Sequence, residues 1–138
     1  MNSDGLEQFF HDYANASMAG DPAAIAAFYA ESFVAAGPKG SAAFQNDDKF
    51  LDWLRQLHDF NQQTGMRAME VVSVSDSAIS EHYILARVGW GAKFEKTGDE
   101  LISFDISYIL YTAPETPKIV AYISHEDQED QMRQLNLL

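Results

Sequence analysis

The sequence contains no cysteine, which excludes disulfides, a thiolate nucleophile and a thiolate metal site and suits a reducing compartment. Basic residues are also scarce. Nine Lys and Arg stand against 21 Asp and Glu, which gives a formal net charge of −12 at pH 7. Because such a chain repels phosphate backbones and anionic lipid surfaces, we expect neither nucleic acid nor a membrane as a partner.

Long hydrophobic runs are missing too. No segment approaches the about 20 apolar residues that span a bilayer. The opening MNSDGLEQFF has neither the basic region nor the apolar region of a signal peptide. Together with the absence of cysteine, these features predict a soluble, cytoplasmic protein.

Several catalytic patterns are absent. The four histidines, His11, His58, His82 and His125, stand far apart, and the segment His125-Glu126-Asp127-Gln128-Glu129 lacks the second histidine of HExxH. No GxGxxG, Walker or GxSxG pattern occurs. We therefore expect no metal, no nucleotide cofactor and no serine nucleophile of the hydrolase type.

What the chain does have is enough apolar sequence for one core. Hydrophobic residues make up 46 % of its 138 positions and aromatic residues 12 %. A chain of this length removes roughly two thirds of its unfolded surface from water. We predict a single domain over residues 1–138.

Helical spacing dominates the first half. The predicted first helix begins behind a cap at Ser3 or Asp4, ends at Gly20 and buries Leu6, Phe9, Phe10, Tyr13 and Ser17. Asp21 and Pro22 predict a second helix whose buried face holds Ile25, Phe28 and Tyr29. A third helix is predicted from a cap within Asn46-Asp47-Asp48 to a stop at Thr64-Gly65, with one apolar face formed by Phe50, Trp53, Leu54, Leu57 and Phe60.

Strand patterns dominate the second half. A short strand is predicted over residues 31–36, and further strands over 66–74, 79–95, 100–112 and 118–124, followed by a last short helix. Turns are expected at Asp76-Ser77, at Thr97-Gly98 and over residues 113–117. Helices followed by consecutive strands predict an α+β fold, with helices on one face of a curved antiparallel sheet.

The length of the strands predicts that this sheet bends. Gly89-Trp90-Gly91 is a plausible place for a bulge or a close approach of backbones. Even positions from Ile102 to Leu110 are uniformly apolar, whereas the odd ones mix polar and apolar residues. Because a monomer rarely exposes a large apolar patch, we expect the second face to be covered by another subunit in a homodimer.

The order of several motifs resembles that of a known superfamily. These motifs are Gly20-Asp21-Pro22, Phe28-Tyr29-Ala30-Glu31, Gly37-Pro38, Trp90 and Lys118-Ile119-Val120. Asp127, followed seven residues later by Gln134-Leu135, is similar to the aspartate and C-terminal QLG of SnoaL-like proteins, with Asn136 in place of the glycine. The chain thus resembles SnoaL-like members of the nuclear-transport-factor-2-like superfamily from about Leu6 to Leu137.

This resemblance implies a cone-shaped α+β barrel with three helices across the mouth of a deep, mostly apolar pocket, and often a dimer. It also implies isomerases, cyclases, hydrolases, dehydratases or non-catalytic modules. Because one fold hosts many chemistries, the site has to be argued from its own residues.

Asp127 is the first catalytic candidate. The resemblance implies a pocket carboxylate that acts as general acid or base, and burial at a strand end would raise its pKa. The alternative is a capping box in which Ser124 caps a helix and Asp127 completes it. His125 has the same strand parity as Asp127 and would form a proton relay with it if the strand persists.

Asp105 is the second candidate and depends on strand register. A two-residue turn at Thr97-Gly98 would set Trp90 opposite Asp105 and Arg87 opposite Tyr108. Asp105 would then anchor a ligand if that face lines the pocket, and would be solvated if it does not. A slip of one residue would separate it from Trp90.

Aromatic residues are the candidates for ligand contact, with plain core packing as the alternative. They are Tyr13, Tyr29, Trp53, Phe60, Trp90 and Tyr108. The sequence thus predicts a pocket protein for a small, largely apolar molecule. It is either a cofactor-free acid/base enzyme (isomerase, cyclase or dehydratase) or a non-catalytic binding or dimerisation module.

Overall fold

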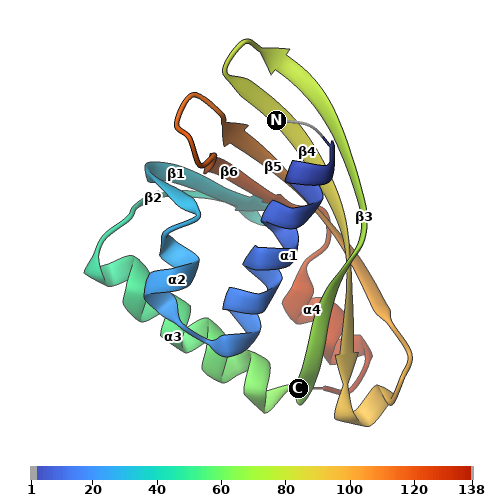
Figure 1. Ribbon diagram of the computed structural model, residues 1–138. Helices are drawn as coiled ribbons and strands as arrows, with labels where there is room; N and C mark the ends of the chain where they lie inside the picture. The colour runs from blue at the N-terminus through green and yellow to red at the C-terminus, as the bar shows by residue number, and fades with distance from the viewer. Residues whose placement is uncertain (1–2, 138) are drawn as a thin grey trace.

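One six-stranded sheet curves around three helices in the computed structural model, which describes residues 3–137 (Figure 1). The elements in order are α1 (Ser3–Ala19), α2 (Pro22–Ala26), β1 (Tyr29–Gly37), β2 (Gly40–Gln45), α3 (Asp48–Gln63), β3 (Met66–Ser80), β4 (Tyr83–Phe94), η1 (Glu95–Thr97), β5 (Ile102–Tyr111), β6 (Lys118–Ser124) and α4 (Gln128–Gln134). The predicted α+β architecture is confirmed.

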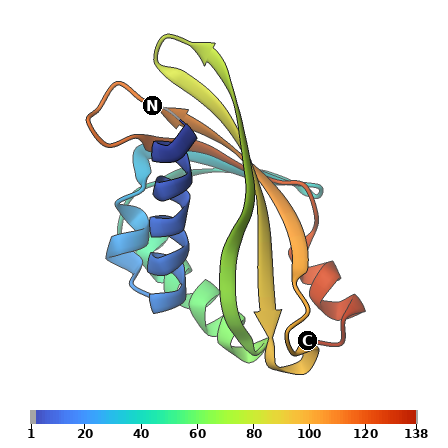
Figure 2. The same ribbon diagram turned by 45° about the vertical axis from the view of Figure 1, so that its right-hand side comes forward.

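The strand order is β2-β1-β6-β5-β4-β3. The four strands from β3 to β6 form the predicted antiparallel meander, and β1 pairs with β6 in parallel. The outermost strands of the sheet, β2 and β3, are not paired with each other, so the sheet is a curved open cone and not a closed barrel. Figure 2 shows α1, α2 and α3 on one side of this sheet.

Capping residues fix the helix boundaries. Gly20 ends α1 with φ +68°, and the Asp21 carboxylate accepts hydrogen bonds from the backbone N–H groups of Ala23 and Ala24 at the start of α2. Asp47 caps α3 in the same way through Phe50 N–H. The cap predicted for α1 was Ser3 or Asp4. Helix α1 begins at Ser3, so Asp4 lies in its first turn, and the side chain of Ser3 is outside the described part.

Two predicted boundaries were wrong. Helix α2 ends at Ala26, so Tyr29 opens β1 instead of lying on the helix. The turn predicted at Asp76-Ser77 lies at Glu81-His82, because β3 continues to Ser80 as an exposed ribbon paired with β4. Backbone pairing with β4 holds this ribbon without an apolar face, which is why side-chain alternation did not reveal it. Strand β2 was not predicted either.

The β4–β5 register differs by one residue from the prediction. A 3₁₀ turn over Glu95–Thr97 and a short loop connect the strands, in place of a two-residue turn. Trp90 therefore pairs with Phe104, Gly89 with Asp105, and Arg87 with Ser107. Since neighbouring residues of a strand point to opposite faces, this shift puts Asp105 on the face away from the Trp90 side chain.

The bend at residues 89–91 arises from the partner strand. Val71 pairs with Trp90 and Ser73 with Gly89, so Val72 is the extra residue of a β-bulge. A Cβ on Gly89 would lie 2.4 Å from Ser73 Oγ, and one on Gly91 would lie 3.0 Å from Val72 and Leu101. The two glycines allow the close approach that the sequence suggested.

Helix α4 ends in a left-handed residue. Asn136, at the position where the resembling family carries glycine, has φ +58°. Asparagine tolerates this conformation better than other residues with a Cβ. Hydrogen bonds from Leu137 N to Met132 O and from Asn136 N to Arg133 O close the helix end. The missing glycine therefore leaves the C-terminal turn intact.

The outer face of the sheet is mixed. Leu85 and Ile123 are more than a third exposed there, and Arg87 forms a 2.7 Å ion pair with Asp105. A homodimer through this face stays a prediction. Within residues 3–137, no helix is long and apolar enough to cross a membrane.

Candidate ligand-binding pocket

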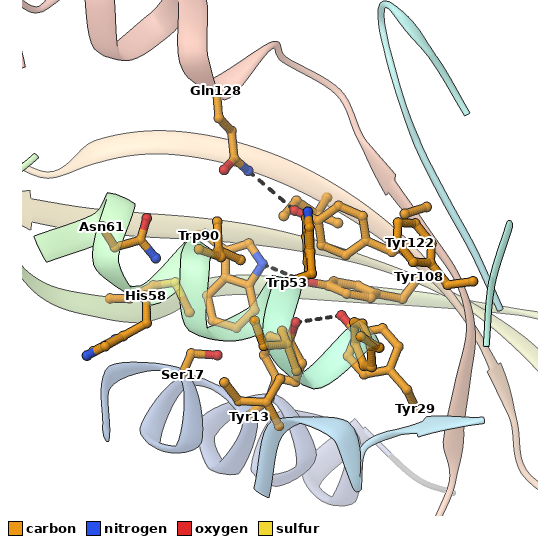
Figure 3. Close-up of a pocket in the computed structure, with 18 of the residues that line it drawn as sticks. Tyr13, Ser17, Tyr29, Trp53, His58, Asn61, Trp90, Tyr108, Tyr122 and Gln128 are labelled. Atoms are coloured by element: carbon orange, nitrogen blue, oxygen red, sulfur yellow. Dashed lines mark hydrogen bonds between the residues drawn. The ribbon is translucent and has the colours of Figure 1, made fainter. Parts of the chain in front are cut away.

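A cavity of about 110 Å³ lies between the helices and the inner face of the sheet (Figure 3). Its lining is dominated by aromatic rings. Tyr13 comes from α1, Tyr29 from β1, Trp90 from β4, Tyr108 from β5 and Tyr122 from β6. Among the described residues, no Asp, Glu, Lys or Arg side chain lines it. The cavity holds several water molecules' worth of space, or one small cyclic molecule.

Two tyrosines from different elements meet in this cavity. The hydroxyl of Tyr13 lies 2.6 Å from that of Tyr29, and either can be the donor. Burial raises the pKa of Tyr13 to about 12, although the hydrogen bond with Tyr29 opposes the shift. Burial also raises the pKa of Tyr29 well above its usual value. Both hydroxyls therefore stay protonated at neutral pH.

The hydroxyl oxygens of two further tyrosines accept hydrogen bonds. Trp90 Nε1 donates to Tyr108 Oη at 3.1 Å, and Gln128 Nε2 donates to Tyr122 Oη at 3.5 Å. Burial raises the pKa of both phenols. These groups can donate hydrogen bonds to a ligand, but none is poised to remove a proton near neutral pH.

The cavity wall near solvent is formed mainly by α3. Trp53 and Leu57 are 43 % and 37 % exposed although their helix face is apolar. His58 and Asn61 continue this edge, and Ser17 of α1 lies across from them. The apolar face of α3 thus serves partly as cavity wall, whereas Phe50 and Leu54 are buried.

Phe60 lies elsewhere. It lines a second, smaller cavity of about 20 Å³, which shares Asn61, Met66, Phe104 and Gln128 with the first. The other five aromatic candidates, Tyr13, Tyr29, Trp53, Trp90 and Tyr108, lie on the wall of the main cavity.

Asp127 lies outside both cavities. Its carboxylate caps α4 by accepting from Asp130 N–H, and it is 3.1 Å from Lys39 Nζ. The backbone hydrogen bond from Asp130 and the Lys39 ammonium lower the pKa of this carboxyl. The expected rise is therefore wrong in sign. The predicted capping box also differs, because Asp127 is itself the cap and Ser124 Oγ donates to Glu126 O.

His125 and Asp105 lie on the outer face. A bulge at Val120 reverses the parity of β6, because Ile119 pairs with Leu110 but Ala121 with Ile109. Tyr122 thereby turns inward, opposite Tyr108, and His125 contacts Ser107 Oγ at 2.7 Å through Nε2. Asp105 pairs with Arg87 there. His125 and Asp127 do not form a relay, and neither they nor Asp105 lines the cavity.

Sequence reasoning missed Tyr122 and Gln128. The bulge that turns Tyr122 inward depends on pairing with β5 and cannot be read from the residue pattern, and Gln128 is the first residue of α4, where the pattern predicts only the start of a helix. In the described part of the chain, no three His, Asp or Glu side chains cluster in a way that could hold a metal ion.

Comparison with protein families decides the wider relationship. The profile of a family described as NTF2-like protein (DUF6841) matches residues 3–127. The chain belongs to this NTF2-like family. No curated protein matches it.

Solved structures share the NTF2-like fold at low sequence identity. A domain of unknown function with a cystatin-like fold from Nostoc punctiforme has a TM-score of 0.67 at 15 % identity, over 99 % of this chain and 86 % of that one. An NTF-2 like protein from Shewanella oneidensis has a TM-score of 0.69 at 14 % identity, over 91 % of this chain and 100 % of that one. The β subunit of benzoate 1,2-dioxygenase from Burkholderia mallei has a TM-score of 0.69 at 12 % identity, over 94 % of this chain and 93 % of that one. At these identities the likeness supports the fold alone.

Proposed function

We propose that this NTF2-like protein binds one small, largely apolar molecule in the cavity between its helices and its sheet, without catalysing a reaction on it. The observation that carries the proposal is the composition of the cavity wall. Aromatic rings surround a space whose polar groups are a few hydroxyls, amides and one imidazole. A mostly apolar concave site with few convergent polar groups is typical of small-molecule recognition.

The acid/base alternative has less support. Isomerisation, cyclisation or dehydration without a cofactor requires a base within hydrogen-bond reach of the substrate. Asp105, Asp127 and His125 contact other residues outside the cavity. The imidazole of His58 does line the cavity, but it lies at the solvent edge and is directed away from the tyrosine hydroxyls (Figure 3). The tyrosines are protonated because burial raises their pKa. Ligand binding therefore fits the site better than proton transfer does.

The experiment titrates the protein with α-methylstyrene, a small planar hydrocarbon. The chain has two tryptophans, and both line the cavity, so the two indole N–H signals in a ¹H–¹⁵N NMR spectrum report on its contents. We expect saturable shifts of the Trp90 signal, assigned by comparison with a Trp53→Phe variant.

Two neighbouring alanines of β1 give a matched pair of variants. Ala35 lines the cavity, whereas Ala36 follows it in the strand and pairs with Ile123. Ala35→Phe fills the cavity and should weaken binding of the probe at least tenfold, and Ala36→Phe should leave it within twofold. No saturable shift in the unmodified protein, or an equal loss in both variants, contradicts the proposal.

Two finer expectations belong to the same proposal. A homodimer through the outer sheet face would cover Leu85 and Ile123, and sedimentation of the protein with and without Leu85→Asp would test it. The cytoplasmic location is inferred from the sequence alone.

A further inference from the structure

The cavity contains phenol protons that have no hydrogen-bond acceptor among the described residues. Tyr13 and Tyr29 share one hydrogen bond, so one of their two hydroxyl protons is used and the other has no acceptor within the described residues. Whichever oxygen donates, the count is the same, because a phenol carries a single proton.

Tyr108 adds a second spare proton. The indole nitrogen of Trp90 can only donate, so Tyr108 Oη is the acceptor of their 3.1 Å hydrogen bond. Within residues 3–137, no acceptor lies within hydrogen-bond distance of the Tyr108 proton. Tyr122 has a third spare proton as long as Gln128 Nε2 donates to its oxygen, at 3.5 Å. If the Gln128 amide is turned, its oxygen accepts the Tyr122 proton, so the cavity has at least two spare protons.

The spare protons gather in one part of the cavity. The ring centroids of Tyr13 and Tyr108 are 6.2 Å apart, and those of Tyr108 and Tyr122 are 5.6 Å apart. Figure 3 shows the hydrogen-bonded hydroxyls of Tyr13 and Tyr29 beside the Trp90–Tyr108 pair. An unsatisfied buried donor is costly, so this cluster favours an occupant that supplies an acceptor.

The acceptor should carry no charge. Among the described residues, no Lys or Arg side chain lines the cavity, and the whole chain has a net charge of −12. The His58 imidazole lies at the solvent edge, away from the tyrosine hydroxyls, so a carboxylate placed at those hydroxyls would lose its hydration without gaining a cationic partner. A carbonyl oxygen loses far less and has two lone pairs for two donors.

We propose that the ligand is a small cyclic or aromatic molecule with a neutral carbonyl group, whose oxygen accepts from the Tyr13–Tyr29 pair and from Tyr108. This inference rests on the proposed function, because it requires that the cavity bind a ligand at all. It adds the chemical class and the end of the cavity at which the polar group lies.

The test compares acetophenone with α-methylstyrene, which has a methylene in place of the carbonyl oxygen. The double variant Tyr13→Phe/Tyr29→Phe removes the hydroxyl pair with its spare proton and leaves neither partner unsatisfied. We expect it to weaken acetophenone about tenfold and α-methylstyrene less than twofold. Tyr108→Phe, which removes the other proposed donor, is a second variant with the same direction, and Tyr83→Phe, on a tyrosine outside the cavity, is the matched control.

An infrared measurement adds a readout that does not depend on affinity. The carbonyl stretch of bound acetophenone should lie at lower frequency in the unmodified protein than in the double variant, because accepted hydrogen bonds weaken the C=O bond. Equal losses for both probes, or an unchanged stretch, overturn the carbonyl inference and leave the binding function standing. Tighter binding of benzoate than of acetophenone overturns it in favour of an anion. If neither aromatic probe binds the unmodified protein, the binding function itself fails.

Discussion

The hydroxyl groups of Tyr13 in α1 and Tyr29 at the start of β1 lie 2.6 Å apart inside the cavity. Both residues are less than a tenth exposed, so this hydrogen bond joins a helix to the sheet away from bulk solvent. It also orients two of the phenols that face the ligand space.

Removing one hydroxyl of this pair should be worse than removing both. Tyr13→Phe leaves Tyr29 buried without its partner, which we expect to lower the free energy of unfolding by about 1–3 kcal/mol. Tyr29→Phe should behave likewise, and the double variant should cost less than the sum of the two. Urea denaturation of all four proteins measures the coupling. Strictly additive losses would show that the 2.6 Å contact contributes nothing.

Alkaline pH should destabilise the fold through the same residues. The pKa of Tyr13 is raised to about 12 from an ordinary 10.0, so the folded state keeps a proton that the unfolded chain releases. Its contribution is complete below pH 10 and is lost as the pH rises through 12. A shift of this size corresponds to about 2–3 kcal/mol.

The measurement is the free energy of unfolding between pH 8 and pH 12. We expect a downward slope above pH 10 that is shallower in the Tyr13→Phe/Tyr29→Phe variant than in Tyr83→Phe. Equal slopes in the two variants would contradict the buried-phenol origin of the effect.

Much of the fold follows from local signals. Asp21-Pro22, Asp47 and Gly20 mark helix boundaries through capping chemistry that acts within a few residues, and the predicted positions hold. The strand from Lys118 to Ser124 was predicted with its observed bounds. The even positions from Ile102 to Leu110, uniformly apolar in the sequence, form the buried face of β5, although the sequence left open which face lines the pocket.

The candidate site was harder to predict because two single-residue irregularities decide which side chains face the cavity. The 3₁₀ turn at Glu95–Thr97 shifts Asp105 to the outer face, and the bulge at Val120 turns Tyr122 inward. Both depend on long-range pairing, which local residue patterns do not report. The acids around Asp127 are explained by the start of α4, where the helix dipole favours negative charge.

Two glycines with similar positive φ angles differ in what surrounds them. Gly98 has φ +66° and open space at its Cβ position, whereas Gly20 has φ +68° and the His58 imidazole 2.5 Å from that position. We expect Gly98→Ala to lower stability by about 1–3 kcal/mol from backbone strain alone, because its φ of +66° with ψ −128° suits only glycine. Gly20→Ala should add the cost of displacing His58 at the edge of the cavity to its own backbone strain.

Thermal melting of both variants, with and without His58→Ala, isolates the contact. His58→Ala should remove the excess cost of Gly20→Ala and leave Gly98→Ala unchanged. If Gly20→Ala costs as much with His58→Ala as without it, the imidazole moves freely and the contact carries no strain.

Asp127 offers a decision between helix cap and binding residue. Asp127→Asn keeps a side-chain oxygen for the cap but removes the charge that faces Lys39, whereas Asp127→Ala removes both. We therefore expect a small decrease of the melting temperature for Asp127→Asn, a larger one for Asp127→Ala, and unchanged acetophenone affinity in both. Asp52→Asn, which removes an exposed carboxylate from an ion pair without touching a cap, is the matched control.

The pH dependence of the melting temperature is a second, independent test of the role of Asp127. The pKa of Asp127 is lowered below 3.8, so its charge stabilises the fold fully above that pH, and the contribution is lost as the pH falls through the lower pKa of the folded state. The melting temperatures of the unmodified protein and Asp127→Asn should therefore differ at pH 6 and converge as the pH drops below 3.8. A constant difference would contradict the contribution of the Asp127 charge, and a loss of acetophenone binding at unchanged melting temperature would place Asp127 in the site and not in the cap.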